Sequence, residues 1–147
     1  MLTLAGQEVF KAPADQVFVE VTDLKKLSEC IPDLQSYELL DENHLKCVVR
    51  PGFSFLRMKM KVDLTVVRYA AQRTATMRAD ARGIGASMAV QSRLQVSERP
   101  SGSVLDWSAE VVQMTGLVAT ISADLVRGAA DQVIRDSWAK LRRQLGE

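Results

Sequence analysis

The chain has 147 residues, 47% of them hydrophobic and 25% charged, and its formal net charge at pH 7 is +1. This length and composition predict one globular domain over residues 1–147 with its own hydrophobic core. A near-neutral charge excludes a bulk attraction to nucleic acid or anionic lipid. No apolar run approaches the ~20 residues needed to span a bilayer, and Met1–Gly6 lack a signal-peptide pattern, so a cytoplasmic protein is expected.

The N-terminal third predicts a strand followed by two short helices. Leu2–Lys11 alternates loosely and ends near Pro13, which indicates a first strand. Residues 12–22 place apolar side chains on one side of a helix. Asp23 is then a typical N-cap for a second short helix that ends at Pro32.

The middle of the chain changes to a period of two, which is the spacing of half-buried antiparallel strands. The clearest case is Leu56–Val66, where apolar residues alternate with charged and polar ones. Turn residues such as Pro51-Gly52 and Gly83-Ile84-Gly85 separate such runs. The predicted strands of this region span residues 35–40, 44–50, 56–66, 72–83, 86–98 and 103–111.

The last segment, Gly116–Leu145, carries apolar residues at helical spacing, so it predicts one long helix of roughly 40 Å. A helix this long needs a broad apolar surface to cover. The element order is therefore one strand, two helices, six strands and a helix. It predicts an α+β protein in which a curved antiparallel sheet wraps around the C-terminal helix.

The side chains predicted to face the helix are unusually small or flexible. Alanine removes volume from the concave side of the sheet, and methionine lines the remaining space with a flexible apolar surface. Two interpretations follow: a cavity for one apolar molecule, or a core that the methionines fill. Phe53 and Phe55, near a turn, could form a lip of that cavity or cap the core. The candidate ligand-binding residues are Phe53, Phe55, Met58, Met60, Met77, Ala79, Met88, Val90, Trp107, Ala109, Ile121, Leu125 and Ala129.

Two local patterns carry a resemblance to a known family. They are LSECIP at residues 27–32 and LDWSAEV at residues 105–111, the latter followed by Gly116-Leu117 and the predicted helix. With the element order, they resemble the family of the carbon monoxide dehydrogenase G subunit, within the START-like, helix-grip (SRPBCC) superfamily. Two features depart from the family pattern: Asp33 replaces a glycine, and the sequence ends at Glu147 without the C-terminal extension that can tether members to a membrane.

The resemblance implies a seven-stranded helix-grip fold and a non-enzymatic, cofactor-free accessory protein. Its partner would be a molybdenum hydroxylase of the carbon monoxide dehydrogenase type, and its ligand a quinone or another lipid-like molecule. Peripheral contact with a membrane is compatible with this role.

The residues themselves give little support to catalysis. His44 is the only histidine and has outward parity, as do Asp63, Asp80, Asp106 and Glu110, so neither a metal site nor a catalytic triad is predicted. Cys30 and Cys47 are expected to be separate buried thiols. One alternative is a cyclase- or aromatase-like enzyme that uses Ser92 or Tyr37. Another is an assembly factor that docks through a basic outer face, which holds Arg57, Lys59, Lys61, Arg78 and Arg82.

Overall fold

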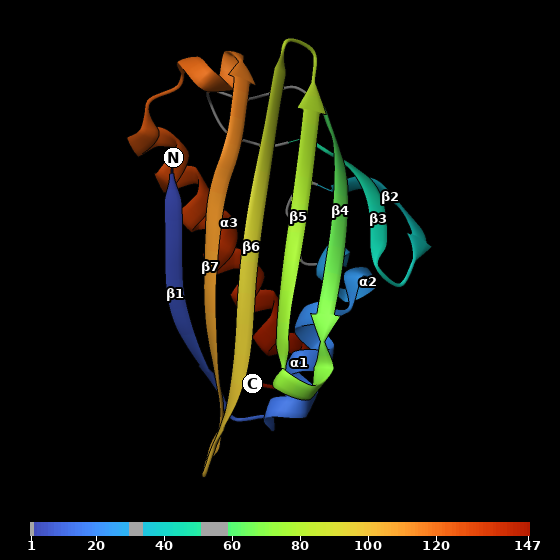
Figure 1. The fold of residues 1–147 in the computed structure, drawn as a ribbon, viewed down its shortest axis with the longest axis vertical. Coiled ribbons are helices and arrows are strands. Elements are labelled where there is room, and N and C mark those ends of the chain that lie inside the picture. The colour runs from blue at the N-terminus through green and yellow to red at the C-terminus, as the bar shows by residue number, and fades with distance from the viewer. Residues whose placement is uncertain (1, 30–33, 51–58) are drawn as a thin grey trace.

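In the computed structural model, which describes residues 2–29, 34–50 and 59–147, seven strands form one curved antiparallel sheet (Figure 1). Their spatial order is β1-β7-β6-β5-β4-β3-β2. This confirms the predicted helix-grip fold class. The strands are β1 (Thr3–Phe10), β2 (Leu34–Asp41), β3 (His44–Val49), β4 (Met60–Tyr69), β5 (Thr74–Gly83), β6 (Ala86–Arg99) and β7 (Gly102–Gly116).

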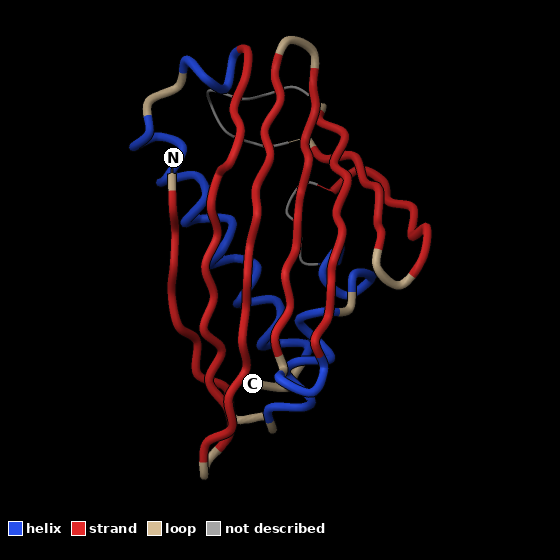
Figure 2. Tube along the Cα trace, in the orientation of Figure 1, coloured by secondary structure: helices blue, strands red, loops and turns tan. Residues whose placement is uncertain are grey.

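Two short helices, α1 (Ala14–Thr22) and α2 (Leu24–Glu29), follow β1 as predicted. Asp23 caps α2, because its carboxylate accepts hydrogen bonds from the backbone N–H groups of Lys25 and Lys26 at 3.0 and 3.2 Å. Figure 1 shows both helices at the end of the sheet where β1 finishes. The chain termini lie toward opposite ends of the sheet (Figure 2).

The C-terminal helix begins later than the sequence pattern predicted. Strand β7 continues to Gly116, a 3₁₀ turn covers Leu117–Thr120, and α3 spans Ala123–Gln144. Its N-cap is Ser122, whose hydroxyl accepts a hydrogen bond from Leu125 N at 3.3 Å. With 22 residues, α3 is about 33 Å long instead of the expected 40 Å.

The hydrophobic core lies at the α1 end of the concave face. Side chains from α1, α2 and the strands, together with Leu141 near the end of α3, form one buried cluster. The backbone of α1 comes closer to β6 and β7 than that of α3 does to any strand. The buried members are Phe10, Ala14, Val17, Phe18, Val21, Leu24, Leu45, Cys47, Val66, Ala75, Leu94, Val96, Leu105 and Leu141.

Two arginines of α3, which crosses the sheet obliquely in Figure 1, tie the helix to the edge strand β1. Arg127 donates to the carbonyl of Thr3 at 3.1 Å, and Arg142 donates to the carbonyl of Val9 at 2.6 Å. Both carbonyls point away from β7, because alternate residues of an edge strand turn their backbone groups outward. Arg142 also stacks over the Phe10 ring, with its guanidinium carbon 4.4 Å from the ring centre.

We predict that Arg142→Leu lowers the free energy of unfolding by about 1–3 kcal/mol, because it removes both the hydrogen bond to β1 and the cation–π contact. Urea unfolding measures the change. The matched control is Arg143→Leu, since the exposed side chain of Arg143 has, within the described part of the chain, one hydrogen bond, to the carbonyl of Ala139 in its own helix at 3.3 Å. That variant should stay within about 0.5 kcal/mol of the native protein. Equal losses in the two variants would contradict the anchoring role of Arg142.

Candidate functional site

The middle of the concave face is partly exposed, whereas its α1 end and several positions toward its other end are buried. On β4, Val62 and Leu64 are partly exposed between buried Met60 and buried Val66. Strands β6 and β7 repeat this gradient. We call the partly exposed residues the central belt: Val62, Leu64, Met77, Ala79, Ala81, Met88, Val90, Ser92, Trp107 and Ala109.

Helix α3 shows the same gradient along the face that it turns toward the sheet. Val126 near its start and Leu141 near its end are buried. Ala129, Val133 and Ser137 between them are only partly buried. The helix therefore contacts the sheet closely at two places and less closely over the central belt.

Six of the candidate ligand-binding residues lie in the central belt: Met77, Ala79, Met88, Val90, Trp107 and Ala109. Ala129 and Ile121 are also partly exposed, on α3 and just before it. Met60 is 2% exposed, so it belongs to the buried border of the belt. Phe53, Phe55 and Met58 lie outside the described residues.

The expected position of Leu125 on the buried face of the helix is wrong. Its side chain is 55% exposed, and its neighbour Val126 takes the buried position. The reason is the late start of α3 at Ala123, which breaks the four-residue spacing that linked Leu117 and Ile121 to Leu125. Counting back four residues from Ala129 therefore gives Leu125, whereas the residue that faces the sheet in the first turn is Val126.

An aromatic cluster borders the belt on the β1 side. The Trp107 ring lies over Gly6, its partner on β1, so that a Cβ added to Gly6 would lie 2.8 Å from Cζ2 of the indole. Trp138 of α3 packs beside it, with 6.4 Å between the ring centres. Trp138 also meets Phe10 edge-on at 6.4 Å, which joins the belt to the core.

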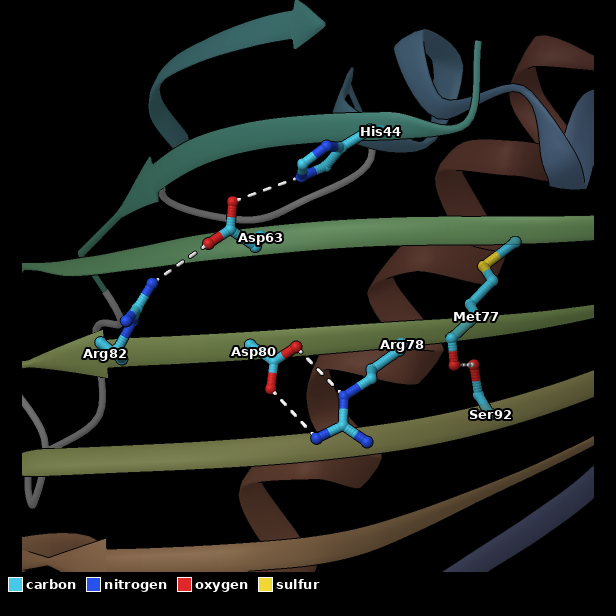
Figure 3. A network of polar contacts seen from close by, with 7 residues as sticks. All are labelled: His44, Asp63, Met77, Arg78, Asp80, Arg82 and Ser92. Carbon is cyan, nitrogen blue, oxygen red and sulfur yellow. Dashed lines mark hydrogen bonds and ion pairs between the residues drawn. The ribbon is translucent and has the colours of Figure 1, made fainter. Parts of the chain in front are cut away.

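Ser92 and Tyr37, the polar residues suggested for an enzyme, lie far apart in the sheet. Ser92 lies in the belt and donates to the carbonyl of Met77 at 3.5 Å (Figure 3). Tyr37 lies on the edge strand β2 and is 45% exposed. Four strand spacings separate β6 from β2, which places the two residues about 19 Å apart along the sheet. Ser92 and Tyr37 therefore cannot act on one bond of a small substrate.

The outer face carries charges that largely pair with one another (Figure 3). Arg78 donates to Asp80 at 3.1 and 3.3 Å, and Arg82 lies 3.4 Å from Asp63. The other Asp63 oxygen lies 3.5 Å from His44 Nε2, so His44 is a member of this network and not an isolated surface residue. Arg57 lies outside the described residues.

A hollow of about 560 Å³ also lies beside this network, near strands β2 to β5. Lys46, Lys61, Asp63 and Arg82 contribute to its lining, so it does not suit an apolar ligand. Within the described residues, no group of three or more histidine, cysteine or acidic side chains could hold a metal ion.

Cys47 is a buried thiol, as predicted. Burial raises the pKa of the Cys47 thiol, and the charge of Asp63 raises this pKa further. Since only the thiolate is nucleophilic, a raised pKa keeps Cys47 protonated and unreactive at neutral pH. Cys30 lies outside the described residues.

The family model for the G subunit of carbon monoxide dehydrogenase (CoxG) matches residues 6–146. The chain belongs to the CoxG family. A search of curated protein sequences found no significant match.

Solved structures place this CoxG protein in the START-like fold. A conserved protein from Geobacillus kaustophilus is 19% identical, with a TM-score of 0.89 over 99% of this chain and 95% of that one. A START superfamily protein from Mycobacterium smegmatis is 12% identical, with a TM-score of 0.70 over 97% and 95% of the two chains. At these identities the likeness concerns the fold alone.

An aromatase/cyclase shares the architecture as well. The di-domain ARO/CYC BexL of the BE-7585A biosynthetic pathway is 11% identical, with a TM-score of 0.71 over 99% of this chain and 47% of that one. In the described part of the CoxG chain, no helix is long and apolar enough to cross a membrane.

Sequence reasoning missed Met114 of the CoxG protein. The ladder between β6 and β7 shifts by one residue between Val90–Val111 and Ala89–Gln113, which makes Val112 the extra residue of a β-bulge. Met114 therefore pairs with Met88 and shares its face, although simple alternation from Val111 would point it outward. The consecutive Val111-Val112 pair was a weak sign of this break in alternation.

We predict that Gly6→Ala displaces the Trp107 ring, because the added methyl group would lie under 3 Å from it. Overpacking of this kind should lower the free energy of unfolding by about 1–2 kcal/mol and change the near-UV circular dichroism of the indoles. Gly128→Ala is the matched control, since Gly128 lies in α3 with no atom within 4 Å of an added Cβ. It should stabilise the protein by up to about 1 kcal/mol. An unchanged spectrum in Gly6→Ala would contradict the close contact.

Proposed function

We propose that this CoxG protein binds one apolar small molecule between the central belt and α3. It would carry this molecule to or from a partner enzyme without changing it. The gradient of burial carries the proposal: the concave face is buried at its α1 end and at Met60, Ala86 and Val111 toward the other end, yet its middle keeps partly exposed apolar side chains. Membership of the CoxG family and the START-like fold support the same function.

The energetics suit an apolar ligand of moderate size. Burial of about 300 Å² of apolar ligand surface would contribute about 7 kcal/mol at 25 cal/mol per Å², against which the loss of ligand freedom must be set. Few polar groups face the belt, so shape and volume would dominate selectivity. The methionines Met77, Met88 and Met114 can adjust to different shapes, which favours a lipid-like molecule or a quinone.

The direct test is native mass spectrometry of freshly purified protein, together with a titration of indole fluorescence by a quinone. We expect a retained apolar mass or saturable quenching of Trp107 and Trp138, which border the belt. If neither is observed at high quinone concentration, the carrier proposal fails.

We also propose that the partner is a molybdenum hydroxylase of the carbon monoxide dehydrogenase type. This step is supported by the family name alone. Genes for the components of a molybdenum hydroxylase beside the gene for this chain, and loss of that activity on its deletion, would support the assignment. Normal hydroxylase activity in the deletion strain would count against it.

We predict that Ala79→Leu weakens binding of a quinone at least tenfold without destabilising the protein. The larger side chain would occupy ligand space in the belt, whereas in a filled core it would cost about 1–3 kcal/mol through overpacking. Calorimetric titration and urea unfolding measure the two effects.

The matched control is Thr65→Leu, which adds bulk to the exposed outer side of the neighbouring strand β4. It should leave quinone affinity unchanged. A destabilised Ala79→Leu protein with normal quinone affinity would show that the belt is a packed core.

A further inference from the structure

The hollow on the outer face of the sheet brings together three cationic side chains from three neighbouring strands. Its volume is about 560 Å³, and its lining includes Lys46 of β3, Lys61 of β4 and Arg82 of β5. These residues lie on the face opposite to the central belt, because Lys61 and Arg82 alternate with the belt residues Val62 and Ala81. The hollow is therefore separate from the apolar site.

Two of the three cations oppose each other directly in the ladder between β4 and β5. Lys61 and Arg82 are partners in its register, which places their Cβ atoms about 5 Å apart. Lys46 lies diagonally across from Lys61, because its own partner on β4 is Asp63. Like charges directly opposite one another destabilise a sheet. An anion bound between these side chains would convert their repulsion into attraction.

The two lysines of the hollow are exposed and have no ion pair among the described residues. For Lys46 this is notable, because its direct partners are acidic on both sides: Glu38 on β2 and Asp63 on β4. Asp63 instead lies 3.4 Å from Arg82 and 3.5 Å from His44 (Figure 3). The ammonium groups of both lysines are therefore available to a ligand.

Arg82 also keeps donors for a ligand, despite its contact with Asp63. Its side chain is 73% exposed, and the contact joins one guanidinium nitrogen to one carboxylate oxygen. Such an exposed ion pair is weak, and a guanidinium group has five N–H donors. The lining contains two carboxylates, those of Asp63 and Glu38, against the three cations. The hollow thus keeps an excess of positive charge.

We propose that this hollow binds a small molecule with a phosphate or carboxylate group, held by Lys46, Lys61 and Arg82. The planar guanidinium and the two ammonium groups would donate charge-assisted hydrogen bonds to the oxygens of that group. Ser36 and Glu38 also line the hollow and can accept hydrogen bonds from hydroxyl groups of such a ligand. The volume is in the range of small-molecule sites.

Nuclear magnetic resonance of the whole isotope-labelled chain tests the site with three probes: inorganic phosphate, AMP as a phosphate ester and succinate as a carboxylate. Sodium chloride at the same ionic strength is the reference for each titration. We expect at least one probe to cause saturable shifts of the amide signals of Lys46, Lys61 and Arg82, and chloride to cause none. Comparison of the three affinities identifies the anionic group that the site prefers.

Lys61→Gln is the most informative variant, because it should change binding and stability in opposite directions. Loss of one charged contact should weaken binding of the probe about fivefold or more. Relief of the repulsion with Arg82 should raise the urea midpoint of the ligand-free protein. Lys46→Gln should weaken binding in the same way. The matched control is Lys11→Gln, which removes an exposed lysine at the α1 end of the molecule and should leave the affinity unchanged.

Three results would overturn the inference. They are the absence of saturable shifts at the hollow with all three probes, native affinity in both Lys61→Gln and Lys46→Gln, and binding of an oligo-aspartate peptide alone, which would assign the surface to an acidic protein. The inference is independent of the carrier function. Lys61→Gln should bind a quinone with native affinity, and a native protein that binds phosphate but no quinone would refute the carrier function and leave this inference standing.

Discussion

The attachment of α3 to β1 at two points is the constraint on which the rest of the structure depends. Arg127 and Arg142 are fifteen residues apart, about 22 Å along a helix, and they bond to the carbonyls of Thr3 and Val9, about 20 Å apart along a strand. Both ends of α3 are therefore tied to β1 through long side chains, while the helix itself crosses the concave side of the sheet obliquely (Figure 1). The helix is straight and the sheet is curved. The two are therefore close at the ends of α3, where Val126 and Leu141 are buried, and farther apart between them.

Side-chain size reinforces this geometry. Ala79 and Ala81 on β5 and Ala109 on β7 add little volume where the curved sheet lies farthest from the helix. A protein interior normally reaches crystal-like packing density, and branched residues at these positions would have served that purpose. The core at the α1 end does follow this rule, with Leu94, Val96 and Leu105 on the same strands. Stability and ligand space are thus assigned to different segments of the same strands.

The sequence predicted what period-two alternation determines: the strands, their order along the chain and most of the concave face. It failed where the backbone departs from regular periodicity. The bulge at Val112 reversed the parity of Met114, and the Ser122 cap moved the start of the last helix past Ile121. Leu117 and Ile121 precede the helix but have the same four-residue spacing as a helical apolar face. Leu125 was therefore assigned to the buried face, although it is exposed. The burial of the Trp138 N–H without a hydrogen-bond partner among the described residues was beyond prediction, because it is a property of tertiary structure.

The contacts of the described residues bear on each of the three functional hypotheses: an enzyme, an assembly factor and a carrier. The enzyme hypothesis rests on Ser92 or Tyr37; the Ser92 hydroxyl donates to the carbonyl of Met77, and Tyr37 is 45% exposed on the edge strand β2. An assembly factor with a basic outer face needs free cations; Arg78 and Arg82 pair with Asp80 and Asp63, whereas Lys59 and Lys61 are exposed and have no ion pair among the described residues. A carrier needs an apolar surface that folding leaves incompletely covered, and the central belt provides one.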